Sequence, residues 1–311
     1  MEFEFFKNWL RRLRDSGNLV PFGLVAWIPY FWLVLFFLIP FAIIVGISFS
    51  EGVIAIPPYK PLWSWVNSET LEIRLSLSNY LFILGDHLYL TAYINSLWVA
   101  FFTTVVCLMI GYPMAYGITR APEKWKLPLL MLVILPFWTS FLVRVYAWMG
   151  LLSDQGFVNH LLIHLGWIKT PLPLMDNFFS VGLGIVYAYL PFMILPLYAA
   201  LEKIDLTLVE AASDLGCQPI RAFWKVVVPL SFRGTLGGAM LVFIPAVGEF
   251  VIPELLGGSK ILMIGKVLWN EFFYNRDWPV ASGLAVLMVL LLLLPMVIFQ
   301  KIQNRGSSDN L

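Results

Sequence analysis

Charged residues are scarce in this sequence. Asp, Glu, Lys and Arg make up 13% of its 311 residues, whereas hydrophobic residues make up 60%. Soluble globular domains carry roughly a quarter charged residues. A hydrophobic core does not account for so large a deficit, so much of the apolar surface must face lipid. The net charge of +1 favours neither a nucleic acid nor an acidic partner.

Patterns typical of enzymes and metal sites are also missing. The two cysteines lie in an apolar run (Cys107) and in a polar segment (Cys217), so a disulfide between them is not expected. No spacing of His, Cys, Asp or Glu resembles a metal site, and no glycine-rich phosphate-binding loop is present. We therefore expect no catalytic residue, metal ion or cofactor in this chain.

Long uncharged runs are what the sequence does have. Six are long enough to cross a bilayer, which takes about 20 residues: 23–49, 90–119, 127–152, 178–201, 234–256 and 280–299. The first follows a basic segment, 1–22, and is too long for the apolar region of a cleavable signal. The sequence therefore predicts an all-α membrane protein with one six-helix domain over residues 23–300, followed by a tail over 301–311.

The distribution of Lys and Arg predicts the orientation of these spans. Thirteen lie at the two termini and in the loops 120–126 and 202–233, whereas six lie in the longer loops on the other side, 50–89, 153–177 and 257–279. Basic residues accumulate in cytoplasmic loops of membrane proteins. We therefore expect a multi-pass inner-membrane protein with both termini in the cytoplasm.

The loop 202–233 has an internal plan of its own. Asp205 or Thr207 can cap a short helix, and Gly216 can end it in the left-handed conformation. Pro219 suits the first turn of a second short helix over 220–227, which Pro229 would end. Such a helix–turn–helix fits a groove on a partner protein. The alternative is an amphipathic helix lying on the lipid surface.

This loop resembles a known motif. The residues Glu210, Ala211, Ala212 and Gly216, followed by Val226-Val227-Val228-Pro229, resemble the EAA loop of ABC importer permeases, with valine in place of the usual Ile and Leu before the proline. The resemblance implies the type I ABC importer permease fold. It also implies that these residues seat in a groove of a cytoplasmic ATPase dimer, which binds ATP and Mg²⁺ in place of this chain.

Four further segments resemble the polyamine importer permeases, and the putrescine system most closely: 55–59, 135–148, 243–258 and 275–279. This similarity covers essentially the whole chain. It implies that the protein translocates polyamines, and putrescine in preference to spermidine. The implied partners are a second permease subunit, the ATPase dimer, a periplasmic polyamine-binding protein and the lipid bilayer.

Three ionisable residues interrupt the spans, and such residues mark transport paths. They are Arg144, Glu249 and Glu254. A carboxylate would stabilise a protonated amine, so we place Glu249 and Glu254 in the substrate path with Arg144. The nearby aromatics Trp138, Tyr146 and Trp148 could add cation–π attraction of about 1 kcal/mol each.

Other readings of these residues stay open at this point. Glu249 and Arg144 could form a structural ion pair, Glu254 could contact a docking protein, and the three aromatics could serve in packing. Three other functions also compete: an ABC importer for another solute or cation, a polytopic membrane enzyme, and a channel working without ATP. The enzyme would need a hydrophilic catalytic cluster, and a channel would have no use for the loop 202–233.

Overall fold

The computed structural model describes residues 22–66, 70–259 and 261–308. Within these ranges five helices are long and apolar enough to cross a membrane, or six if the bent helix pair is one broken span. The predicted all-α membrane fold is thereby confirmed. The basic segment 1–21, Lys260 and the last three residues lie outside the described part of the chain.

Four of the predicted spans are single, continuous helical segments. The first consists of α2 (Phe22–Leu33), a π-helical turn η1 (Val34–Leu38) and α3 (Ile39–Ser48). The second, fourth and sixth are α5 (His87–Arg120), α9 (Phe178–Leu201) and α15 (Trp278–Ser308). The helix α15 continues well beyond the predicted end of the last span at Phe299.

The other two predicted spans are interrupted. Residues 127–152 form α6 (Glu123–Ile134), a 3₁₀ turn η2 (Leu135–Trp138) and α7 (Phe141–Leu152), with a bend of 88° at the break. Residues 234–256 form the end of α12 (Val228–Val247), a turn, and α13 (Val251–Leu256). Irregular backbone at membrane depth is tolerated where protein or a water-filled cavity surrounds it. The turn between α12 and α13 meets this condition, because Val247 and Glu249 are buried, whereas Trp138, Thr139 and Ser140 at the first break are exposed.

Pro229 does not end a separate short helix, and this part of the prediction is wrong. The helix α11 (Pro219–Ala222) passes through a π-helical turn η3 (Phe223–Val227) directly into α12. The amide of Val228 donates to the carbonyl of Phe223, five residues back. A proline lacks an N–H and its ring crowds the carbonyl of the preceding turn. The wider π turn accommodates both effects, and the same arrangement precedes Pro40 after η1.

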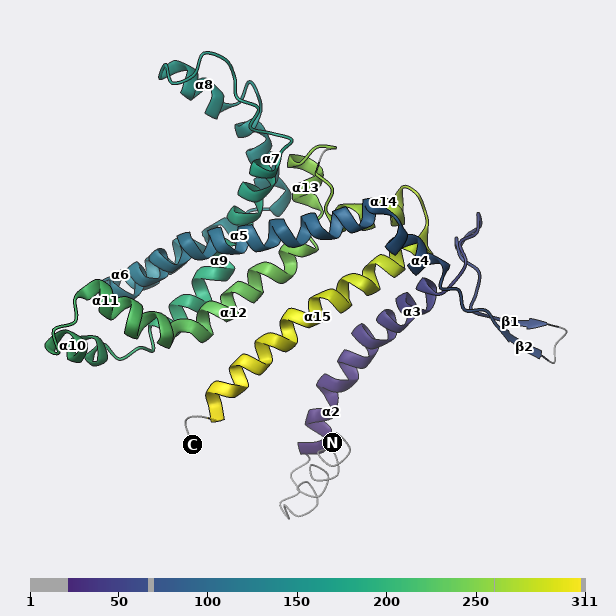
Figure 1. Ribbon diagram of the computed structural model, residues 1–311, viewed down its shortest axis with the longest axis horizontal. Coiled ribbons are helices and arrows are strands. Elements are labelled where there is room, and N and C mark those ends of the chain that lie inside the picture. The colour runs from purple at the N-terminus through teal and green to yellow at the C-terminus, as the bar shows by residue number, and fades with distance from the viewer. Residues whose placement is uncertain (1–21, 67–69, 260, 309–311) are drawn as a thin grey trace.

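Connecting segments lie at both ends of the long helix α5, whereas α8 (Phe157–His164) projects beyond α7 (Figure 1). The short helices α10 (Thr207–Asp214) and α11 lie at one end, and α4 (Ser78–Gly85) and α14 (Ile264–Phe273) lie at the other. A hairpin of β1 (Trp63–Val66) and β2 (Thr70–Ile73) projects from this second end. The sequence analysis did not predict this hairpin, although its two strands are rich in Trp, Val, Thr and Ile, which favour strands.

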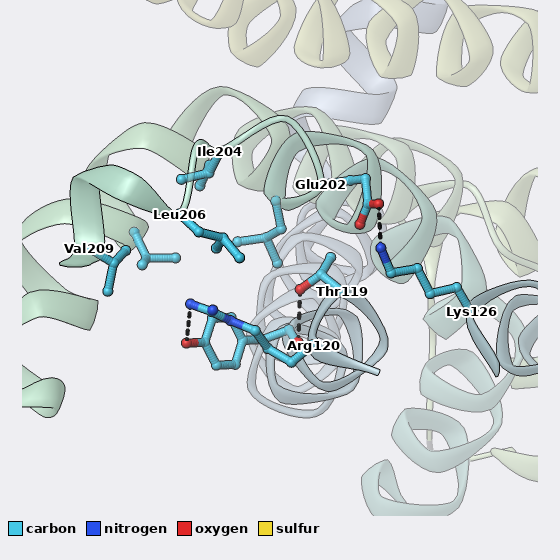
Figure 2. A pocket seen from close by; sticks show the side chains of 10 residues that line it. Thr119, Arg120, Lys126, Glu202, Ile204, Leu206 and Val209 are labelled. Carbon is cyan, nitrogen blue, oxygen red and sulfur yellow. Dashed lines mark hydrogen bonds and ion pairs between the residues drawn. The ribbon is translucent and has the colours of Figure 1, made fainter. Parts of the chain in front are cut away.

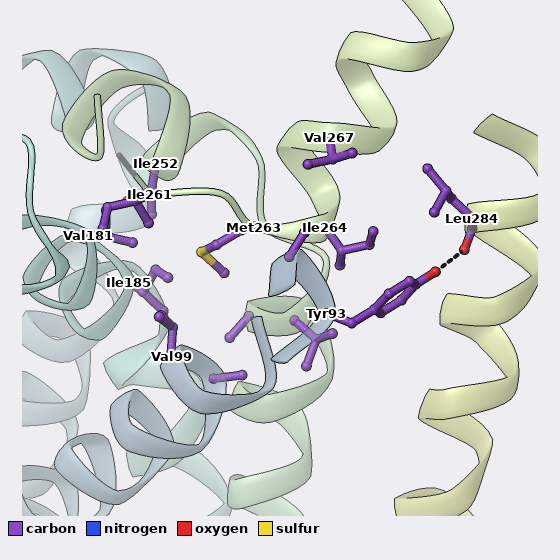
Figure 3. Close-up of a cluster of buried hydrophobic side chains, with 14 of the residues drawn as sticks. Tyr93, Val99, Val181, Ile185, Ile252, Ile261, Met263, Ile264, Val267 and Leu284 are labelled. Atoms are coloured by element: carbon purple, nitrogen blue, oxygen red, sulfur yellow. Dashed lines mark hydrogen bonds between the residues drawn. The ribbon is translucent and has the colours of Figure 1, made fainter. Parts of the chain in front are cut away.

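The core lies where α5, α9, α13, α14 and α15 meet (Figure 3). Buried polar side chains there hold the backbone of neighbouring elements. The hydroxyl of Tyr93 donates to the carbonyl of Leu284 at 2.7 Å, and that of Ser96 accepts the amide of Ile264 at 2.7 Å. An unsatisfied backbone group in lipid costs several kcal/mol. The bond from Ile264 therefore satisfies the first amide of α14, which has no partner within its own helix, and the bond to Leu284 joins α5 to α15.

Candidate functional site

The loop 202–233 begins with the capped helix that the sequence predicts. The amide of Thr207 donates to the Asp205 carboxylate at 3.0 Å, and this bond holds the pKa of Asp205 below its usual value. At the other end Gly216 has a φ of +81°. The amide of Cys217 donates to the carbonyl of Ala212 at 3.0 Å, and that of Gly216 to Ser213 at 2.9 Å. Together these two bonds form a Schellman C-cap.

The tip of this loop presents both charge and apolar surface. Glu210 and Ala211 are exposed, Ala212 is half-buried, and Leu215 is 90% exposed. Ile220 and Trp224, on the second limb, are also exposed. An exposed cluster of large apolar side chains marks an interaction surface.

Aromatic contacts join the second limb of the loop to α5. The ring of Phe223 meets the rings of Tyr112 and Tyr116 edge to face, at 5.6 and 5.3 Å between centroids. The hydroxyl of Tyr112 is hydrogen-bonded to that of Ser231 at 2.7 Å. The second limb of the loop is therefore packed directly on α5.

The first limb rests on a small pocket of about 100 Å³ between the ends of α5, α6 and α9 (Figure 2). Ile204, Leu206 and Val209 line it from the loop. On its opposite wall Lys126 of α6 forms an ion pair of 2.7 Å with Glu202, the residue that follows α9. The base of the loop is thus bound to two membrane helices.

A second, larger pocket of about 570 Å³ lies at the two helix breaks. Glu249, in the turn between α12 and α13, is only 8% exposed and lines this pocket. Its carboxylate accepts the hydroxyl of Tyr189 at 2.5 Å and the amides of Val251 and Ile252 at 3.0 and 3.4 Å. Hydrogen bonds to the charged form stabilise a carboxylate. This explains how Glu249 sits at membrane depth.

Arg144 lines the same pocket from α7 but does not pair with Glu249. Its guanidinium lies over the rings of Phe137 and Phe141, at 5.3 and 5.7 Å from their centroids. Its buried Nε has no hydrogen-bond partner, and within the described ranges no ion pair involves Arg144. The structure therefore does not show the structural ion pair that the sequence left open.

The other expected path residues lie outside this pocket. Glu254 pairs with Lys266 at 3.0 Å, and the Lys266 ammonium also donates to the carbonyl of Gly258 at 2.8 Å. Trp138 and Tyr146 are exposed on the surface of the chain. Trp148 packs against the ring of Tyr187 at 5.4 Å. Only Glu249 and Arg144 of the six residues come together.

The aromatic lining of this pocket was not among the site residues predicted from the sequence. Besides the rings under Arg144, the pocket is lined by Tyr189, Phe192 and Phe250. Tyr189 and Phe192 are three residues apart and so share one face of α9. That spacing was visible in the sequence, but nothing in it indicated that this face meets the turn at Glu249.

Comparison with known proteins identifies the family. The family model described as "Binding-protein-dependent transport system inner membrane component" matches residues 4–308. The chain is 38% identical to the spermidine/putrescine transport system permease protein PotB of Haemophilus influenzae, over 85% of this chain and 89% of that protein. It is 36% identical to PotB of Escherichia coli, over 86% and 92%.

Solved structures show the same fold. A chain of the bacterial alginate ABC transporter, crystallised in complex with a pentasaccharide-bound periplasmic protein, superposes with a TM-score of 0.64 at 13% identity. The match covers 98% of this chain and 97% of that one. A chain of the MetNI methionine ABC transporter gives a TM-score of 0.52 at 18% identity, over 69% and 94%. The fold is that of a type I ABC importer permease. The chain belongs to the family of inner-membrane components of binding-protein-dependent transport systems.

Proposed function

We propose that this chain is a permease subunit of an ATP-driven importer that carries polyamines, putrescine among them, across the inner membrane. The observation that carries the proposal is Glu249, a nearly buried carboxylate that lines an aromatic pocket at a break in a membrane helix. The similarity over most of the chain to permeases named for spermidine and putrescine supports the same substrate class.

The chemistry of the pocket suits a protonated amine. Moving a bare ammonium out of water costs several kcal/mol unless an opposite charge compensates. Glu249 supplies that charge, and its three hydrogen bonds hold it in place without an ion pair to Arg144. The faces of Tyr189 and Phe192 can add cation–π attraction. The methylene segments of a polyamine would contact the same rings.

The loop 202–233 is our candidate for the contact with the ATPase. In this proposal the loop and both termini lie in the cytoplasm, and a separate ATPase dimer holds ATP and Mg²⁺. Glu210 and the exposed Leu215 would contact that dimer, and Gly216 would set the turn between the limbs. A second permease subunit would close the open side of the Glu249 pocket. A polyamine-loaded periplasmic protein would dock at the end that carries α14 and the hairpin.

Reconstitution tests the substrate class. The chain is co-expressed with the second permease and the ATPase of the proposed importer, purified as a complex, and placed in proteoliposomes with the binding protein. Labelled putrescine and spermidine are then supplied with ATP inside the liposomes. We expect ATP-dependent uptake that unlabelled polyamine suppresses and sulfate does not. Absence of polyamine uptake by an assembled complex that hydrolyses ATP would refute the proposal.

Reporter fusions test the orientation separately. A reporter that works only in the periplasm should be active when it is joined after Phe49. A reporter that works only in the cytoplasm should be active when it is joined within residues 121–126. The opposite result at both sites would invert the topology.

One observation favours a different solute. The guanidinium of Arg144, which lines the same pocket and forms no ion pair within the described residues, would suit a substrate that carries a carboxylate beside its ammonium, such as a basic amino acid. Uptake of labelled arginine or ornithine in the same proteoliposomes, unaffected by excess putrescine, would decide for this alternative.

A further inference from the structure

Lys126 lies at the centre of a three-residue ion network at the base of the loop. Its ammonium is 2.7 Å from Glu202 and 2.9 Å from Glu123, and its side chain is only 17% exposed. By contrast Lys124, two residues earlier on the same helix, is exposed and takes part in none of the ion pairs of the described chain. The two lysines therefore differ in their ion pairs, although both are basic residues at the start of α6.

The Lys126–Glu202 ion pair joins two elements that meet again at the larger pocket. Glu202 directly follows α9, whose Tyr189 and Phe192 line the Glu249 pocket. Lys126 belongs to α6, which leads into η2 and its pocket residue Phe137. At a rise of about 1.5 Å per residue, Phe192 lies roughly 15 Å along the chain from Glu202, and Phe137 lies about as far from Lys126.

An aromatic contact makes the second connection. The rings of Phe137 and Phe192 meet edge to face, with their centroids 5.2 Å apart. Phe137 also carries the guanidinium of Arg144 on its face. The ends of α6–η2 and α9 are thus in contact both beside the loop and beside the pocket.

We infer that Lys126 is a positioning residue that transmits movement of the loop 202–233 through α6 to the wall of the Glu249 pocket. This inference rests on the proposed function, because it assumes that an ATPase drives the loop. The two carboxylates are solvent-accessible, with the Glu202 and Glu123 side chains 36% and 87% exposed, and ion pairs in contact with solvent contribute little to stability. Loss of the Lys126–Glu202 pair should therefore leave folding and assembly nearly unchanged, while the pocket no longer follows the loop.

The test measures the number of substrate molecules carried per ATP hydrolysed in the reconstituted complex. Lys126→Gln should keep the wild-type rate of basal ATP hydrolysis but lower the transport-to-hydrolysis ratio several-fold. Lys124→Gln, which makes the same charge change on the same helix, should retain the wild-type ratio. The double variant Lys126→Glu with Glu202→Lys, which reverses the pair, should recover most of the ratio.

Each outcome decides the inference. A wild-type ratio in Lys126→Gln overturns it, and so does an equal loss in Lys124→Gln or a double variant no better than Lys126→Gln. If Lys126→Gln reduces the amount of assembled complex, Glu202→Gln replaces it, because this change removes the same 2.7 Å contact and leaves Lys126 paired with Glu123. Failure of the wild-type complex to take up any polyamine would instead refute the proposed function, and the two results are thus distinguishable.

Discussion

The hydroxyl of Tyr189 donates a hydrogen bond of 2.5 Å to the carboxylate of Glu249, 60 residues further along the chain. This bond joins the middle of α9 to the turn that interrupts the fifth span. Directly after this turn, the amides of Val251 and Ile252 donate hydrogen bonds to the other carboxylate oxygen of Glu249. Glu249 is therefore held in one orientation by three donors from two elements.

Tyr189→Phe removes one of these donors and keeps the ring. Hydrogen bonds to charged groups contribute about 1.5–3 kcal/mol, so loss of orientation at Glu249 should raise the KM for polyamine uptake about tenfold or more. The maximal rate and the amount of complex should change little. Uptake kinetics in proteoliposomes measure both parameters. An unchanged KM would show that the hydroxyl does not serve the substrate site.

Glu249→Gln removes the charge and should lower polyamine uptake about 100-fold, which corresponds to about 2.8 kcal/mol. The complex should still assemble and hydrolyse ATP, because the glutamine oxygen can accept some of the same hydrogen bonds. Because Arg144 does not pair with Glu249, the double variant Arg144→Gln with Glu249→Gln should not restore uptake. Normal transport by this double variant would exclude Glu249 as a substrate contact.

Gly216 tests the turn between the two limbs of the loop. Its φ of +81° is strained for a β-branched side chain, by about 1–3 kcal/mol, whereas a Cβ at this position would meet no atom within 4 Å. Gly216→Val should therefore reduce co-purification of the ATPase without loss of membrane insertion. Gly216→Asn is the matched control, since asparagine tolerates this conformation, and it should retain most of the association. Equal behaviour of the two variants would contradict the backbone argument.

A substitution at Gly265 tests whether close packing of α14 against the backbone at Glu249 is needed for transport. A Cβ on Gly265 would lie 2.7 Å from the carbonyl oxygen of Glu249 and closer still to that of Gly248. Because both are backbone atoms, the turn must shift. We expect Gly265→Ala to reduce uptake and to destabilise the subunit by about 1–3 kcal/mol, the usual cost of overpacking. Gly237→Ala, where the added Cβ meets nothing within 4 Å, is the control for both thermal stability and uptake.

The cap of α10 predicts a pH dependence. The amide of Thr207 holds the pKa of Asp205 below its unfolded value. The stabilisation of the helix is therefore complete above the unfolded pKa and is lost as the pH falls through the folded pKa. Hydrogen exchange corrected for intrinsic rate should show loss of protection at residues 208–211 only under strongly acidic conditions. Asp205→Ala should show the weakened protection at neutral pH already, and equal protection in both proteins would contradict the role of the cap.

The loop 202–233 shows which structural features can be predicted from the local sequence. The cap and the positive φ at Gly216 depend on residues within one helical turn. The sequence left Asp205 and Thr207 as alternatives for the cap, and the hydrogen bond from the Thr207 amide decides for Asp205, whereas the positive φ at Gly216 is as predicted. The end of the second limb was not, because Pro229 was read as a helix stop. A π turn at Phe223–Val227, packed on Tyr112 and Tyr116 of α5, lets the helix continue. That packing partner is more than 100 residues away in sequence.

By itself the sequence determined that six apolar segments are long enough to cross a membrane, because lipid imposes length and composition on each span separately. Tertiary structure decided which ionisable residues share a pocket. Glu249 and Arg144 line one cavity through the breaks at residues 139–140 and 248–250, whereas Glu254, only five residues from Glu249, faces Lys266. The physical reason is that hydropathy reports only whether a segment is apolar. The bend of a span and the direction of its side chains depend on the helices packed against it.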